Sequence, residues 1–295
     1  MPEQKERRQM LNPRLDANFK AIFTQDTEES RIALRSFLTA AIGLKVEGVT
    51  VIKNEEVRDY GTQRGLRYDI KCVFDDGTLA QVEMQGSDSH QIYGKRAEYH
   101  AARLLSSVLD VGDNWEKIPK TYQISVLDCE FDKTHGDFFH HYRMMDGRDG
   151  ARLSGTLNVI FMELPKLPLL TDETDIRNLP SIVKWCKFLK EADNPAEQDL
   201  IDILAESEEG IMNAETTLAN ISADRWRWLV QGQIEADKKL ATANIYYAKE
   251  EGKIEASREN ARNLLKMNLG TNEQIAQACS LPLDEVLALK EELAR

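Results

Sequence analysis

Residues 67–85 read RYDIKCVFDDGTLAQVEMQ, in which two alternating apolar runs flank a DDG turn signal at 75–77. A three-residue loop that closes with glycine in the left-handed region is a common connection between antiparallel strands. With this loop, the numbers of paired residues add up to 152, and Asp69 lies directly opposite Glu83. The stretch therefore predicts a β-hairpin with a defined register.

The predicted hairpin has one apolar and one polar face, because successive side chains of a strand point to opposite sides. We expect the apolar face to belong to the core, and it carries Tyr68, Ile70, Cys72, Phe74, Ala80, Val82 and Met84. The polar face carries Arg67, Asp69, Lys71, Gln81, Glu83 and Gln85, with Val73 and Leu79 near the turn. Cross-strand β-carbons lie about 4.5–5.5 Å apart. Facing carboxylates at that distance repel, unless one is protonated or both bind a cation.

A cation between Asp69 and Glu83 is the functional interpretation of this face. Carboxylate oxygens suit Mg²⁺ or Mn²⁺, and such an ion can activate a water molecule and stabilise a phosphoryl transition state. The alternative is a solvent-exposed strand face, whose carboxylates pair with Arg67 and Lys71. A turn that differed by one residue would misalign the two acids, so the functional interpretation depends on the register.

The segments around the hairpin predict an α/β fold with a mixed sheet. Apolar residues at helical spacing indicate two helices within residues 15–43 and one over about 90–110. Further strands are expected near 46–52, 121–128, 137–144 and 156–163. Beyond Pro168 the chain is predicted to be all α-helical, with helices near 175–191, 196–208, 211–220, 223–250, 257–268, 271–279 and 283–293.

These elements suggest four regions. We expect a polar N-terminal arm over 1–13, the α/β domain over 14–168, a helical region over 169–255 and a small helical tail over 256–295. The tail has a weak likeness to a helix-turn-helix. Few basic residues occur in it, which favours a structural or self-associating role over base readout.

Trp226 and Trp228 lie beside Arg225 and Arg227, and Trp226 follows helical spacing with Leu229. This spacing favours packing of the tryptophans in the core or between domains over stacking on DNA.

Composition narrows the class of protein. Of the 295 residues, 42% are hydrophobic and 30% are charged, as in folded globular proteins. No run approaches the roughly 20 apolar residues of a membrane span, and the charged N-terminus lacks the apolar core of a signal peptide. We therefore expect a soluble cytoplasmic protein. The four cysteines show no CxxC spacing, which predicts reduced thiols.

The net charge of −12 argues against a passive nucleic-acid coat. The acidity is uneven, however. From residue 171 on there are 15 basic and 24 acidic residues, whereas the preceding part has 23 and 26. Acidic residues at a metal site would also be neutralised by the ion. The charge balance weakens a DNA-binding interpretation but does not exclude it.

Several short segments, taken in order, resemble the PD-(D/E)XK nuclease superfamily. The resemblance is greatest to its branch of recombination-promoting nucleases (Rpn) and transposases, and it spans roughly residues 12–165. The segments are LDANFK at 15–20, YDI at 68–70, EMQ at 83–85, Lys95-Arg96 with Tyr99, and ISVLD at 124–128.

The resemblance implies a restriction-endonuclease-like fold and a metal-dependent DNA endonuclease that uses Mg²⁺ or Mn²⁺. Asp69 and Glu83 would be the metal ligands. Gln85 stands where the superfamily more often has lysine, a residue that positions the attacking water and stabilises charge. Glutamine cannot act as a base, so the charge role stays open. Lys95 is the first candidate for a displaced lysine, and Lys71 is the second.

Other residues receive secondary roles. Asp16 is a candidate accessory acid, and Lys20, one helical turn later, could be only its i,i+4 ion-pair partner. Candidate contacts to DNA phosphates are Lys20, Lys71, Arg96 and Tyr99. On the helix over 90–110, Arg96 shares a face with His100 and Arg103, which could equally be a solvated face.

Three hypotheses follow. The first is a Mg²⁺-dependent endodeoxyribonuclease that acts in recombination, mobility or defence, as a homodimer if it cuts both strands. The second is a catalytically inactive nuclease fold that binds DNA or another protein, which Gln85 and the acidic balance favour. The third is a regulatory scaffold that self-associates through its helical C-terminal half.

Overall fold

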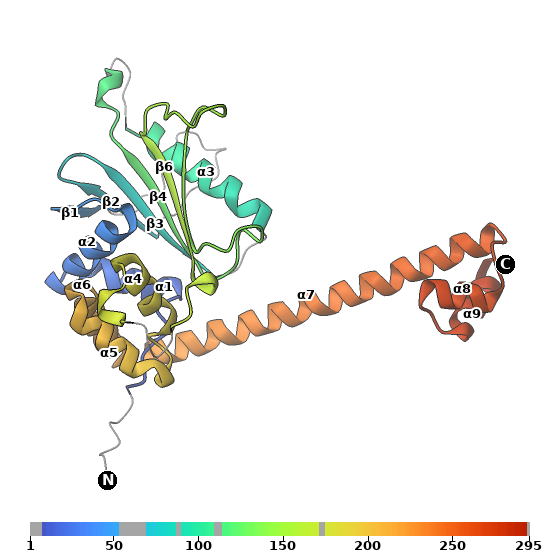
Figure 1. The fold of residues 1–295 in the computed structure, drawn as a ribbon. Helices are drawn as coiled ribbons and strands as arrows, with labels where there is room; N and C mark the ends of the chain where they lie inside the picture. The colour runs from blue at the N-terminus through green and yellow to red at the C-terminus, as the bar shows by residue number, and fades with distance from the viewer. Residues whose placement is uncertain (1–7, 53–68, 87–89, 109–113, 171–174, 294–295) are drawn as a thin grey trace, which may run out of the picture. The chain divides into compact units, whose positions relative to one another are not determined.

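The computed structural model describes residues 8–52, 69–86, 90–108, 114–170 and 175–293 (Figure 1). By its internal contacts the chain divides into two compact units, Met1–Gln231 and Gly232–Arg295. The first unit contains the sheet and the candidate site. Within the described residues, no helix has the length and apolar character needed to cross a membrane.

The first unit is built on a six-stranded mixed sheet, which confirms the predicted α/β class. The strand order is β1-β2-β3-β4-β6-β5. β3, β4 and β6 are parallel, whereas β1–β2, β2–β3 and β5–β6 are antiparallel. The strands are β1 (Val49–Ile52), β2 (Ile70–Phe74), β3 (Leu79–Gln85), β4 (Thr121–Leu127), β5 (Phe139–Arg143) and β6 (Leu157–Glu163).

The hairpin of β2 and β3 has the predicted register. Ile70 pairs with Val82, and Lys71 pairs with Gln81. Gly77 adopts a φ of 83°, the left-handed conformation that the turn requires. Tyr68 and Arg67 lie outside the described residues, so their predicted positions on the two faces stay predictions.

Five helices share the main core with one face of the sheet. This core includes Ile70, Cys72, Ala80, Val82 and Met84, which confirms the described part of the predicted apolar face. The helices are α1 (Asp16–Thr24), α2 (Glu28–Ile42), α4 (Ser181–Glu191), α5 (Gln198–Ser207) and α6 (Glu209–Ser222). Short 3₁₀ turns occur at Trp115–Lys117, Leu164–Lys166, Ile176–Asn178 and Pro195–Glu197.

The main core runs across the predicted boundary at residue 168. Trp185 and Phe188 of α4 pack there with Phe23 of α1 and Phe37 of α2. Leu11, from the predicted polar arm, is also fully buried in it. The four predicted regions stay a prediction, and the shared core gives a physical reason to expect that residues 14–168 need α4–α6 to fold.

The opposite face of the sheet is covered by α3 (His90–Ser106), which connects the parallel strands β3 and β4 (Figure 1). Tyr93, Ala97 and Ala101 of α3 pack there on Val159 and Phe161 of β6. The polar face of β3 is therefore not exposed to solvent.

Burial of this face settles one alternative, because Gln81 and Glu83 are both buried. The expectation of a solvent-exposed strand face is wrong for β3. A hairpin sequence alone does not reveal the crossover helix that covers it.

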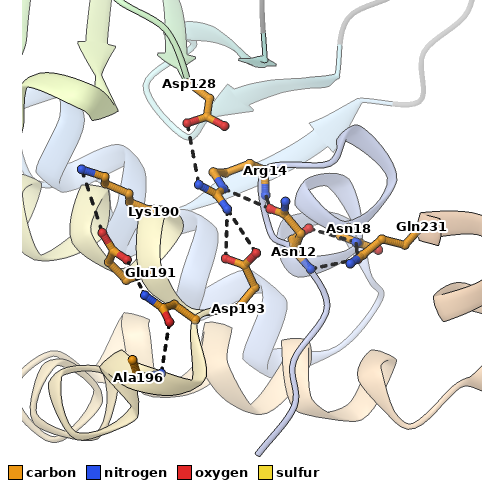
Figure 2. A network of polar contacts seen from close by, with 10 residues as sticks. Asn12, Arg14, Asn18, Asp128, Lys190, Glu191, Asp193, Ala196 and Gln231 are labelled. Carbon is orange, nitrogen blue, oxygen red and sulfur yellow. Dashed lines mark hydrogen bonds and ion pairs between the residues drawn. The ribbon is translucent and has the colours of Figure 1, made fainter. Parts of the chain in front are cut away.

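The N-terminal segment is fixed by a polar network, shown in Figure 2. The Arg14 guanidinium donates to both carboxylate oxygens of Asp193 at 3.1 Å and lies 3.8 Å from Asp128, which follows β4. The Asn12 side-chain oxygen accepts a hydrogen bond from the backbone N–H of Arg14. The backbone N–H of Asn12 donates to the side-chain oxygen of Gln231 at 2.9 Å. These contacts tie the start of α1 to the end of β4, and they determine where α1 presents its first residues.

The helices near 223–250 and 257–268 form one helix, α7 (Arg225–Lys266). No proline occurs in this stretch, and Gly252 alone does not end a helix of otherwise favourable residues. Trp226 is 69% exposed, so its predicted packing is wrong, whereas Trp228 packs on the main core. In the second unit, α8 (Asn272–Cys279) and α9 (Leu283–Leu293) pack with the end of α7 around Ile275 and Val286.

We predict that Trp185→Ala lowers the free energy of unfolding by about 3–5 kcal/mol, because it removes a fully buried indole and leaves a cavity. The indole also donates to Ser36 Oγ at 3.1 Å. Urea titration followed by circular dichroism measures the change. Trp115→Ala is the matched control, since Trp115 is 79% exposed and its loss should cost less than about 0.5 kcal/mol. Equal effects of the two substitutions would contradict the shared core.

Candidate active site

Asp69 lies at the entrance of β2, next to the end of β3. Its Oδ2 accepts a hydrogen bond from the backbone N–H of Met84 at 2.9 Å. This bond joins Asp69 to the residue that follows Glu83, so both acids of the predicted pair lie at the same end of the hairpin. The Asp69 side chain keeps 18% of its surface exposed and is open to a ligand.

Helix α1 brings a lysine and a second acid to Asp69. Lys20 Nζ lies 3.3 Å from Asp69 Oδ1 and 2.8 Å from Asp16 Oδ1. Lys20 therefore bridges two carboxylates and does more than pair with Asp16 along the helix. Burial lowers the pKa of Lys20, but its contacts with Asp16 and Asp69 outweigh this effect, and the net shift is upward.

Asp69 has a strongly perturbed pKa. Burial raises it to about 6, the backbone hydrogen bond from Met84 lowers it, and the neighbouring Asp16 raises it through its charge and a side-chain hydrogen bond. Lys20 lowers it, but less than the other effects raise it. The nearby positive charge is therefore not enough to stabilise the ionised form of Asp69 fully. A bound cation would stabilise that form.

Glu83 is buried under α3 and meets three side chains of that helix. Its Oε1 lies 2.6 Å from His100 Nδ1, and its Oε2 lies 3.3 Å from the Tyr93 hydroxyl. Arg96 Nη2 is 3.9 Å from Oε2 and adds positive charge nearby. The Glu83 side chain is 3% exposed.

Gln85, on the same face of β3, accepts a hydrogen bond from Arg96 Nη1 at 3.3 Å. Arg96 thus contacts both polar residues at the end of β3. Lys95 and Tyr99 lie on the exposed side of α3. Lys71 is half-buried on the polar face of β2, and burial lowers its pKa.

The predicted site residues therefore fall into two groups. Asp16, Lys20 and Asp69 contact one another, and Asp69 also accepts from the backbone N–H of Met84. Glu83, Gln85 and Arg96 form a second set under α3. Lys20 forms an ion pair with Asp69. The roles of Lys95, Lys71 and Tyr99 stay predictions.

Tyr93 and His100 were not predicted as partners of Glu83. The spacing of Tyr93, Ala97, His100 and Ala101 is that of one helical face, and all four are buried. The polar character of His100 had favoured a surface role instead. The helical pattern was a usable signal, because a histidine between two alanines of an inward face points to the sheet.

The donor set fits a divalent cation. Mg²⁺ is usually held by one or two carboxylates, together with water and substrate phosphates. Asp69 and its neighbour Asp16 supply carboxylate oxygens, and the raised pKa of Asp69 reflects charge that lacks compensation. Each Glu83 oxygen has one hydrogen-bond partner, and Oε2 also lies near the Arg96 guanidinium. Over the described ranges, no group of three or more His, Cys, Asp or Glu residues is arranged so that it could hold a metal ion.

A family model described as PD-(D/E)XK nuclease family transposase matches residues 13–244. No curated protein and no solved structure matches the chain.

We predict that Asp69→Asn stabilises the metal-free protein at pH 8 by about 1–3 kcal/mol. The pKa of Asp69 is raised in the folded chain, so folding favours its protonated form. Wild-type stability is therefore lost as the pH rises from about 4 through 6 and stays low above that range. Asparagine is always neutral and can still accept from Met84 N–H.

The measurement is urea unfolding at pH 4, 6 and 8 in the presence of a chelator. Asp137→Asn serves as the control, because Asp137 is exposed. A less stable Asp69→Asn variant at pH 8 would show that Lys20 fully compensates the carboxylate.

Proposed function

Because the chain belongs to the PD-(D/E)XK nuclease family transposases, we propose that it is a metal-dependent endonuclease that hydrolyses phosphodiester bonds of DNA. PD-(D/E)XK nucleases generally use divalent metals, and we propose Mg²⁺ or Mn²⁺ here. The observation that carries the proposal is the meeting of Asp16, Lys20 and Asp69 at the end of β3, where Asp69 accepts from the backbone N–H of the residue that follows Glu83.

Asp69 and Glu83 are the proposed metal ligands, and Asp16 is the proposed accessory acid. A bound divalent cation supplies Lewis-acid stabilisation of the phosphoryl transition state and lowers the pKa of water. The chain's own residues provide the orientation. Met84 N–H fixes one oxygen of Asp69, and α3 fixes both oxygens of Glu83.

Lys20 is the proposed source of positive charge that the lysine of other superfamily members supplies. Its ammonium lies within 3.3 Å of Asp69, close to where a scissile phosphate would meet the ligands. A lysine in that position can stabilise negative charge on the transferred phosphoryl group. Gln85 then contributes no charge, and its role is to orient Arg96 through their hydrogen bond.

Arg96 and Lys71 are the proposed contacts to DNA phosphates, with Tyr99 further along α3. Arg96 is 41% exposed although it reaches Gln85, so its side chain lies at the edge of the site. Phosphate contacts of this kind position the duplex without reading its sequence.

A module that binds DNA or protein without cutting is the second candidate. The observation that favours it is Gln85, whose neutral amide lies where catalytic charge would be expected. The cleavage experiment below distinguishes the two candidates.

We predict that the purified chain linearises or nicks plasmid DNA with Mg²⁺ or Mn²⁺. Asp69→Ala and Glu83→Ala should each lower the rate at least ~10²-fold, because each removes a proposed ligand oxygen pair. Gel electrophoresis of a time course measures the rates. Asp137→Ala is the control for loss of a carboxylate and should cut like the wild type. Binding of DNA without cleavage under either ion would favour the second candidate.

We further predict that Lys20→Met lowers the cleavage rate by about 10²–10³-fold, whereas Lys95→Met lowers it less than about 10-fold. Methionine keeps most of the length and apolar volume of lysine but removes the charge. Single-turnover rates at saturating protein isolate the chemical step from binding. A larger loss with Lys95→Met would return the charge role to Lys95 and assign Lys20 to an ion pair within α1.

A further inference from the structure

Glu83 is a buried carboxylate whose surroundings all supply hydrogen-bond donors. Both Glu83 and His100 are nearly inaccessible, with side chains 3% and 5% exposed, and they are joined by a 2.6 Å contact. A buried ionised carboxylate is costly unless donors and positive charge surround it. His100, as a donor through Nδ1, provides one such contact, and Arg96 provides nearby charge.

The second hydrogen-bond partner of Glu83 is Tyr93, which is the last of a row of hydrogen-bonded side chains. The amide of Gln123 donates to Ser125 Oγ at 3.1 Å, and Ser125 Oγ lies 3.0 Å from the Tyr93 hydroxyl. The same hydroxyl lies 3.3 Å from Glu83 Oε2. Gln123 and Ser125 are fully buried on β4, directly beside β3.

The Tyr93 hydroxyl has one proton, which it can donate to Ser125 Oγ or to Glu83 Oε2. Gln123 donates to Ser125 Oγ from the other side. The row therefore holds the Tyr93 hydroxyl in place beside Glu83.

The packing of α3 holds these donors in place. The Tyr93 ring contacts the Phe161 ring, with centroids 5.6 Å apart. The Arg96 guanidinium lies over the Tyr93 ring, with its central carbon 5.7 Å from the ring centroid. Ala97 and Ala101 are small and fully buried, which lets the helix approach the sheet closely. Tyr93 and His100 thus project from a rigid face onto the two oxygens of Glu83.

The two contacts orient the carboxylate without exhausting it. Each oxygen of an ionised carboxylate offers two lone pairs, and Tyr93 and His100 use one on each oxygen. Capacity for a cation is left on both. Partners behind a ligand carboxylate commonly affect metal affinity or activity by about 10–100-fold.

We propose that Tyr93 and His100 are positioning residues, which hold the Glu83 carboxylate in one orientation for a divalent cation. The proposal rests on the proposed function, because that function makes Glu83 a metal ligand. In this proposal, the buried row Gln123–Ser125–Tyr93 helps to hold Glu83 in place and also contributes to the packing of the fold.

The test is Mn²⁺ binding to the full-length protein, measured by electron paramagnetic resonance of the free ion. Tyr93→Phe keeps the ring and removes the donor, and we expect Mn²⁺ to bind about 10-fold more weakly. His100→Ala should weaken binding by about 10–100-fold. Tyr142→Phe is the matched control, since Tyr142 is exposed on β5, and it should bind Mn²⁺ like the wild type.

A second substitution of His100 distinguishes a positioning role of this residue from a packing role. His100→Asn places an amide donor near the former Nδ1 but fills less space than imidazole, and we expect it to recover most of the Mn²⁺ affinity that His100→Ala loses. A packing role would leave the asparagine variant as weak as the alanine variant, and this result would overturn the proposal. If His100→Ala does not fold, as seen by circular dichroism, Tyr93→Phe and His100→Asn decide the question.

The Mn²⁺-binding and DNA-cleavage experiments test the positioning roles and the proposed function independently of each other. Wild-type affinity in Tyr93→Phe, with wild-type protein that cuts DNA, overturns the positioning roles and leaves the proposed function intact. Wild-type protein that binds Mn²⁺ but does not cut DNA overturns the endonuclease, while weakened binding in Tyr93→Phe still supports the positioning roles. Wild-type protein that binds no Mn²⁺ overturns both.

Discussion

The register of the β2–β3 hairpin is the constraint on which the site depends. Gly77 closes the turn with a positive φ, and the ladder from Ile70–Val82 to Val73–Leu79 follows from it. Because side chains alternate along a strand, a shift of one residue would exchange the two faces. Val82 would then leave the core, and Glu83 would enter an apolar layer with no donors. The same apolar packing that stabilises the sheet thus selects the direction in which Glu83 points.

The face that Glu83 shares with Gln81, Gln123 and Ser125 is both polar and buried, which is an expensive combination. Among the residues that the structure describes, neither amide atom of Gln81 has a hydrogen-bond partner, although the side chain is fully buried. A buried polar group left unsatisfied costs about 1–3 kcal/mol. An apolar layer under α3 would be more stable, so a polar layer at this position is better explained by the chemistry of Glu83 than by folding. Stability comes instead from the opposite face, where α1, α2 and α4–α6 form the main core.

The sequence alone predicted features that depend on local periodicity and turn chemistry. Alternation and the DDG turn yielded the hairpin, its register and its core face. Features that depend on contacts between distant segments were not accessible in this way. The covering of Glu83 by α3, the bridge from Lys20 to Asp69 and the insertion of Trp185 beside Phe23 each join segments that are far apart in the chain. For Lys20, helical spacing showed Asp16 as a partner, but no local pattern could show that α1 lies against the start of β2.

The charge at the site explains how an acidic chain can meet a polyanion. Without a cation, Lys20 offsets one of the two negative charges of Asp16 and Asp69, and the desolvated Asp69 responds with a raised pKa. Addition of two positive charges would reverse the local sign from net negative to net positive around these three residues. Lys20 would then be free to face a phosphate, since its carboxylate partners would have a stronger counter-ion. The net charge of −12 would oppose association at long range, but screening limits this repulsion to about 8–10 Å at physiological salt. Under the proposed function, affinity for DNA would therefore depend on occupancy of the site by a cation, because Asp16 and Asp69 would repel the phosphates of DNA in its absence.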